Sequence, residues 1–112
     1  SAEFTDYGKW VFSTLAWQVS RYPSDFSVEL EGHTERGRPQ KSENYSDWEM
    51  TADRANAARR ELLRHGVAAE QIKKVAGYAD TQPAQDRKPE DPSNRRVTVL
   101  LKIRAGNRLP SS

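Results

Sequence analysis

The stretch YSDWEMTADRANAARRELLRHGV at residues 45–67 decides the fold, because it predicts a long helix with one narrow apolar face. The serine and glutamate of its SDWE segment, which begins at Ser46, have the spacing of a capping box. Thr51 is a second possible cap. We therefore predict a helix within residues 47–65, in which a short turn precedes regular helix from about Ala52.

Small residues recur on the inner face of this helix. Ala55, Ala58 and Leu62 follow one another at three- and four-residue spacing, which is typical of a buried helix face. Alanines at such positions predict close packing against a neighbouring element. Gly66 suits the left-handed residue that follows the end of a helix.

The segment before this helix predicts a further helix at residues 5–22 and a strand at residues 26–32. In the strand, apolar and polar residues alternate, which indicates one buried face. Trp10 and Trp17 extend the apolar surface of the first helix, so we expect that helix to lie against a sheet. Its apolar stripe consists of Tyr7, Val11, Phe12, Leu15 and Val19.

The segment after the central helix predicts two more strands, at residues 72–78 and 95–104. Three prolines make residues 79–94 a loop. We predict one domain over residues 1–106, followed by a tail at 107–112. The order of elements predicts an α+β fold, a two-layer α/β sandwich in which a small mixed sheet has its helices packed on one face.

The composition excludes several classes of function. The chain has 112 residues, with 18 basic and 16 acidic ones, and it contains no cysteine. Such a near balance argues against a dedicated nucleic-acid binder, and zinc sites built on thiolates are excluded. No apolar run is long enough for a membrane helix, so we expect any membrane anchor to lie outside this chain.

Residues after the first strand and at the start of the central helix form the candidate binding site. In a strand–helix–strand unit these two places lie at the same edge of the sheet, which brings Thr34 and Glu35 near Arg54. A guanidinium and free helix amides suit a carboxylate, and the acid suits an ammonium group. Two alternatives are left open. Arg54 could be an ordinary surface arginine paired with Asp53 or Asp47, and Glu35 could be a solvated loop acid.

The last strand adds two arginines to these candidates. Asn94, Arg95 and Arg96 open it, and consecutive strand residues point to opposite faces, so at most one arginine should reach a single site. The two histidines, His33 and His65, form no recognisable pair with a nucleophile, and no metal-binding spacing is present. We therefore expect no enzyme, no metal and no cofactor.

These segments together resemble the OmpA-like peptidoglycan-binding family. The resemblance covers residues 26–104 through ELEGHTE, the long central motif, VAGYAD and NRRVTVLL, and the central motif is most similar to the periplasmic domain of MotB-type flagellar stators. It implies a non-catalytic domain of the periplasm that binds the diaminopimelate of peptidoglycan stems and anchors an envelope complex to the cell wall. It also implies a homodimer attached to a membrane segment outside this chain.

The resemblance assigns the main ligand contacts to Glu35 and Arg54, with Asp47 and the last-strand Arg95 beside them. The family usually has Asp and Asn where this chain has Glu35 and Asp47. These two differences leave open an alternative, a degenerate OmpA-like domain that serves as an interaction or dimerisation module. The family's strand before the first helix is missing, so we expect a three-stranded sheet or an edge that pairs with another copy.

Nucleic-acid binding through the basic face of the central helix is a weaker alternative. Acidic residues interrupt this face, and aromatic residues for stacking on bases are not grouped with it. The basic residues concerned are Arg54, Arg59, Arg60 and Arg64, and the acidic ones are Asp53 and Glu61.

Overall fold

The computed structural model describes residues 6–39 and 42–103. Four parts of the predictions lie outside this description. They are the first residue of the N-terminal helix, the side chain of Tyr7, residue 104 of the last strand and the tail at 107–112. The elements in chain order are α1 (Asp6–Ser20), β1 (Phe26–His33), α2 (Asp47–Arg64), a 3-10 helix (Ala69–Gln71), β2 (Ile72–Gly77), a 3-10 helix (Pro92–Asn94) and β3 (Arg96–Ile103).

The three strands form one mixed sheet in the order β2-β1-β3. The central strand β1 is parallel to β2 and antiparallel to β3. Its pairing with β3 runs without interruption from Phe26 opposite Ile103 to His33 opposite Arg96. The predicted α+β fold with a small mixed sheet is therefore confirmed, and in the described residues the sheet has three strands.

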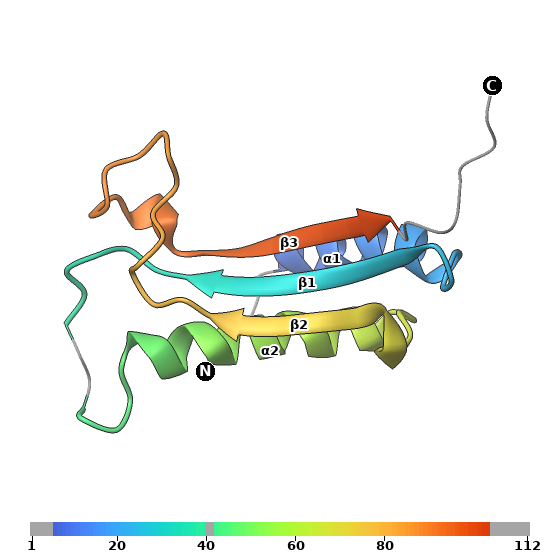
Figure 1. The fold of residues 1–112 in the computed structure, drawn as a ribbon, viewed down its shortest axis with the longest axis horizontal. Helices are drawn as coiled ribbons and strands as arrows, with labels where there is room; N and C mark the ends of the chain where they lie inside the picture. The colour runs from blue at the N-terminus through green and yellow to red at the C-terminus, as the bar shows by residue number, and fades with distance from the viewer. Residues whose placement is uncertain (1–5, 40–41, 104–112) are drawn as a thin grey trace.

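Both helices cover the same face of the sheet, as Figure 1 shows. The buried apolar side chains of the core come from α1, β1, α2 and the turn after α2. Ala55 and Ala58 of α2 are fully buried, as the predicted close packing requires. The core consists of Phe12, Ala16, Val19, Val28, Leu30, Ala55, Ala58, Leu62 and Val67.

The prediction for the tryptophans of α1 is wrong. Trp10 and Trp17 are 63% and 56% exposed, and Val11 is exposed as well, whereas Phe12 and Val19 face the core. Arg21 lies 4.4 Å from the ring centre of Trp17 on the outer side of the helix. The reason is geometric: a helix presents only one narrow stripe to a sheet, and Phe12, Ala16 and Val19 already fill it.

The helix α2 begins at Asp47, so the predicted turn at its start and the regular helix from about Ala52 are wrong. Ser46 is the N-cap: its hydroxyl accepts a hydrogen bond from the Trp48 backbone N–H at 3.2 Å, and Glu49 accepts one from the Ser46 N–H at 2.7 Å. This capping box satisfies two backbone donors at once, whereas a start near Ala52 would leave them unsatisfied. At the other end, Gly66 has the predicted left-handed backbone, with φ +104.

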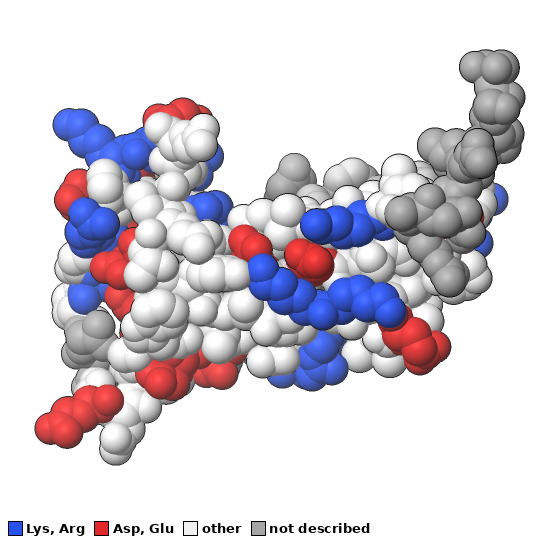
Figure 2. Space-filling view, in the orientation of Figure 1, with Lys and Arg blue, Asp and Glu red and all other residues white. Residues whose placement is uncertain are grey.

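The second face of the sheet is turned to solvent. Figure 2 looks onto this face and shows acidic and basic side chains interspersed across it. Glu31 of β1 accepts a hydrogen bond from the Lys74 Nζ of β2 at 3.0 Å. None of the helices in the described part of the chain is long and apolar enough to cross a membrane.

Candidate functional site

The candidate site lies at the end of the sheet where β1 and β2 finish and α2 begins (Figure 1). Two glycines allow the strands to approach the helix there. A Cβ on Gly32 would lie 2.0 Å from the carbonyl oxygen of Thr51, and one on Gly77 would lie 2.4 Å from the backbone nitrogen of Ala52. Only glycine fits at these positions, so the ends of the strands are held directly against the helix.

Thr51 connects the three elements at this point. Its buried hydroxyl donates to the Asp47 carbonyl at 2.8 Å and accepts from the Ala79 N–H at 3.0 Å. The Ala79 carbonyl in turn accepts a hydrogen bond from the Thr34 N–H at 3.0 Å. The segment that follows β1, which carries Thr34 and Glu35, is thereby fixed beside the second turn of α2.

Glu35 is paired with Arg95 in a two-pronged ion pair. Arg95 donates from Nη2 to Oε2 at 2.5 Å and from Nε to Oε1 at 3.3 Å. The Thr34 hydroxyl donates to Oε1 at 2.6 Å. Burial by itself raises the pKa of Glu35, but Arg95 and Thr34 outweigh it and lower that pKa to about 2. The carboxylate is therefore ionised, and it is 9% exposed while its partner is 46% exposed.

The guanidinium of Arg54 interacts with the charges of this pair, and it has no hydrogen bond or ion pair with another described residue. It is half-buried. Burial lowers its pKa, the positive charges of Arg95 and Arg38 lower it further, and the negative charge of Glu35 opposes them. Because a guanidinium stays protonated in proteins, the result is a charged, partly desolvated donor group that lacks a partner.

The position of Arg54 corrects the reasoning that placed it at the mouth of the helix. Since α2 begins at Asp47, Arg54 lies about two turns inside the helix. The backbone N–H groups around it are used by the helix, so free amides do not contribute to binding at this residue. A ligand bound at Arg54 would therefore be held by side chains alone, without a contribution from free helix amides.

Two further side chains border Arg54. The Tyr45 hydroxyl donates to Asp53 Oδ2 at 2.6 Å, which fixes the chain just before α2. Arg38 donates from Nη1 to the Met50 Sδ at 3.6 Å, which places its guanidinium over the first turns of the helix. Sequence reasoning did not assign Arg38 or Tyr45 to the site: Arg38 lies outside the quoted motifs, and Tyr45 opens the central motif but was given no role.

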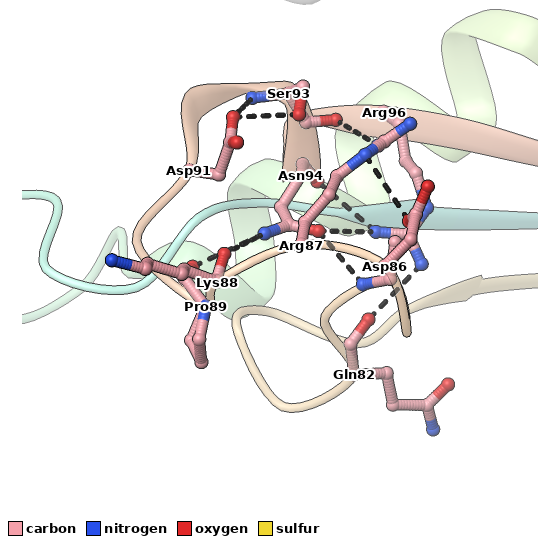
Figure 3. Close-up of polar contacts among 10 residues, drawn as sticks. Gln82, Asp86, Arg87, Lys88, Pro89, Asp91, Ser93, Asn94 and Arg96 are labelled. Atoms are coloured by element: carbon pink, nitrogen blue, oxygen red, sulfur yellow. Dashed lines mark hydrogen bonds and ion pairs between the residues drawn. The ribbon is translucent and has the colours of Figure 1, made fainter.

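The long loop between β2 and β3 is organised around Asn94, as Figure 3 shows. This side chain is fully buried. Its oxygen accepts from the Ala84 N–H at 2.9 Å, and its nitrogen donates to the Lys88 carbonyl at 2.8 Å. Arg96 donates to the Gln82 carbonyl at 3.1 Å and closes the base of the loop. Asn94 therefore shapes the loop that presents Arg95.

A model of the OmpA family matches residues 3–97 of this chain. The chain belongs to the OmpA family. It is 37% identical over 102 residues to Motility protein B of Escherichia coli K12, in a match that covers 90% of this chain and 32% of that protein. The chain thus spans about a third of the length of this curated relative.

Solved structures share the fold of this OmpA-family domain. The C-terminal domain of Helicobacter pylori MotB superposes with a TM-score of 0.77 at 21% identity, over 95% of this chain and 81% of that one. The peptidoglycan-associated lipoprotein of Burkholderia pseudomallei gives 0.73 at 19% identity, over 91% of this chain and 83% of that one. At these identities the likeness shows a common fold.

The OmpA-family domain brings four of the six predicted site residues together. Thr34, Glu35 and Arg95 are hydrogen-bonded to one another through the glutamate, and the charge of Arg54 interacts with Glu35 and Arg95. Among the described residues, the side chains of the other two make no hydrogen bond with this group. Asp47 is the first residue of α2, about two turns from Arg54, and Asn94 has its side chain within the loop.

Arg95 and Arg96 diverge, as their consecutive positions predict. Arg95 reaches Glu35, whereas Arg96 reaches the Gln82 carbonyl. His33, next to Thr34, is buried and stacks on Tyr78 with ring centres 5.4 Å apart. Among residues 6–39 and 42–103, no group of three or more His, Cys, Asp or Glu side chains is placed to hold a metal ion.

Proposed function

We propose that this domain binds the peptide stem of peptidoglycan and anchors an envelope complex, such as a flagellar motor stator, to the cell wall. Membership of the OmpA family supports this proposal, as does the likeness to Motility protein B and to a lipoprotein named for its association with peptidoglycan. The proposed location is the periplasm, since the periplasmic domain of Helicobacter pylori MotB shares the fold.

The observation that carries the proposal is the partnerless, half-buried Arg54 beside the Glu35–Arg95 pair. A guanidinium binds a carboxylate through two parallel hydrogen bonds, and partial desolvation strengthens them. The side-chain end of diaminopimelate carries a carboxylate and an ammonium group on one carbon. The carboxylate would bind Arg54, and the ammonium would bind Glu35.

Glu35 can still accept the ammonium group. A carboxylate has about four acceptor positions. Three are occupied, by the Thr34 hydroxyl and by two N–H groups of Arg95, and the backbone N–H of Glu35 also hydrogen-bonds to the carboxylate. Because little acceptor capacity is left, the contact of Glu35 with the ammonium group is the weaker one and Arg54 provides the main contact. We propose no chemical step, and the ligand is held but not transformed.

Co-sedimentation with purified sacculi tests the proposal. Arg54→Ala should reduce the fraction of protein in the pellet at least tenfold, because it removes the half-buried guanidinium that binds the ligand carboxylate. Arg60→Ala is the matched control: it removes the same charge from an exposed position of α2 and should leave the bound fraction unchanged. A folded Arg54→Ala protein that pellets like the parent would contradict the assignment of the site.

A second candidate is favoured by the occupied state of Glu35. If Arg95 is its permanent partner, the pocket is degenerate and the domain is an interaction or dimerisation module. Titration calorimetry with a diaminopimelate-containing stem peptide distinguishes the two. Silence at millimolar peptide, together with a concentration-dependent dimer in sedimentation equilibrium, would support the module. Heat on binding would support the wall anchor.

A further inference from the structure

We infer that Arg38 is a second anion-binding residue of this site and makes it selective for stem peptides that end in two free carboxylates. The inference rests on the proposed function and adds to it a preference among peptidoglycan stems. It concerns a residue that lies outside the quoted motifs, in the segment between β1 and α2.

The position of Arg38 follows from its contact with α2. Its Nη1 lies 3.6 Å from the Met50 Sδ. Met50 and Arg54 are four residues apart on the helix, and side chains at this spacing are neighbours on one face. The guanidinium groups of Arg38 and Arg54 therefore lie on the same side of α2, and the positive charge of Arg38 helps to lower the pKa of Arg54.

The backbone around Arg38 limits where its side chain can go. Gly37, the preceding residue, has a left-handed backbone with φ +91, which turns the chain. A Cβ added to Gly37 would meet nothing within 4 Å beyond its chain neighbours. Pro39 after it restricts Arg38 to extended backbone. The Arg36 N–H donates to the Pro89 carbonyl at 2.9 Å and ties this segment to the loop that carries Arg95.

The contacts of Arg38 leave most of its donors available. A guanidinium has five N–H donors, and a thioether sulfur is a weak acceptor. The hydrogen bond to Met50 is the one that the described residues give to this side chain. Arg38 is held in place by a weak contact and, like Arg54, lacks a carboxylate partner.

The charge balance of the site indicates the class of ligand. The positive charges of Arg38 and Arg95 both act on Arg54, and among the described residues Glu35 is the carboxylate whose charge opposes them there. Arg95 is neutralised by Glu35, so two adjacent positive charges remain. A ligand with one carboxylate can pair with one of these two guanidinium groups, whereas a ligand with two carboxylates can pair with both.

A stem peptide that ends at diaminopimelate has this property. Its terminal diaminopimelate carries two carboxylates, the α-carboxylate of the backbone and one at the end of the side chain. Both are free. In a longer stem the α-carboxylate is converted to an amide bond, and one negative charge moves a residue further away. The site should therefore prefer stems in which diaminopimelate is the last residue.

Calorimetric titration with two synthetic tripeptides tests the inference. Both end in diaminopimelate, one with a free α-carboxylate and the other with an α-carboxamide. The parent protein should bind the free acid about tenfold more tightly than the amide. Arg38→Ala should bind both peptides with the affinity that the parent has for the amide, and Arg38→Lys should keep part of the preference because it keeps the charge.

Arg36→Ala is the matched control, because it removes an exposed arginine from the same segment and should keep the tenfold preference. Circular dichroism must show that each variant is folded. Equal affinity of the parent for both peptides, or an undiminished preference in Arg38→Ala, would overturn the inference and leave the proposed function intact. Failure of the parent to bind either peptide would overturn both.

Discussion

Replacing Gly32 with alanine tests the close approach of β1 to α2, on which the geometry of the site depends. The added Cβ would lie 2.0 Å from the Thr51 carbonyl oxygen and 2.8 Å from its carbonyl carbon. Both positions belong to backbone, so no change of rotamer relieves the overlap. The helix must move away from the strand by more than an ångström.

This displacement lowers the free energy of unfolding of the domain. Overpacking of a well-packed interior costs about 1–3 kcal/mol. We expect the upper end, about 3 kcal/mol, because the displaced helix also loses contacts at Ala55 and Ala58, which are fully buried. For a domain of this size the melting temperature should fall by roughly 10–20 °C.

The assay is thermal unfolding followed by circular dichroism, together with co-sedimentation with sacculi well below the melting temperature. Binding should weaken even in the folded Gly32→Ala protein, because Arg54 moves with α2 away from Glu35. Gly37→Ala is the control, since it introduces left-handed backbone strain of about 1–2 kcal/mol without an overlap. A Gly32→Ala protein that melts no lower than Gly37→Ala would refute the reasoning.

Three further predictions concern Glu35, Asn94 and Ser46. Although burial opposes it, Arg95 lowers the pKa of Glu35 from 4.5 to about 2, so its stabilising effect is complete above pH 4.5 and is lost as the pH falls towards 2. In denaturant titrations, Glu35→Gln should reduce the unfolding free energy at pH 7 by up to about 3 kcal/mol. It should also flatten the dependence of that free energy on pH between pH 2 and 4.5. An unchanged pH dependence would count against the ion pair. Asn94→Ala should destabilise the domain by about 2–3 kcal/mol and speed hydrogen exchange at the Ala84 amide, which it leaves without an acceptor; unchanged protection there would show that another group holds the loop. Ser46→Ala should lower the unfolding free energy in urea by about 1 kcal/mol, and no loss would mean that the capping box does not hold the start of α2.

Local patterns in the sequence were sufficient to predict the architecture. The alternation in β1 and the spacing of Ala55, Ala58 and Leu62 report directly on which side is buried. Topology also predicted Glu35 and Arg54 at the same edge of the sheet, but it placed Arg54 at the start of the helix, whereas this residue lies about two turns inside α2. The start of α2 was harder, since Ser46 and Thr51 are both acceptable caps and only the complete set of hydrogen bonds distinguishes them.

The side-chain partners in the site could not be predicted in the same way. Arg95 and Glu35 are 60 residues apart, and neither their pairing nor the loop contacts of Asn94 are encoded in a local pattern. Arg38 was missed because its role depends on a contact with Met50 across the turn before α2. Such choices are decided by tertiary packing, which brings together groups whose sequence spacing carries no information.

The antiparallel pairing of β1 with β3 has a consequence for the order in which the protein can fold. β1 is made early, but each of its residues from Phe26 to His33 pairs with a residue synthesised some 60 to 80 positions later. Arg95, which neutralises Glu35, arrives at the same late moment. During synthesis the central strand must therefore wait with one edge unpaired, and Glu29 and Glu31 on it would discourage neighbouring nascent chains from docking there. The three-stranded sheet and the candidate site are thus complete only once Arg95 and β3 have been synthesised.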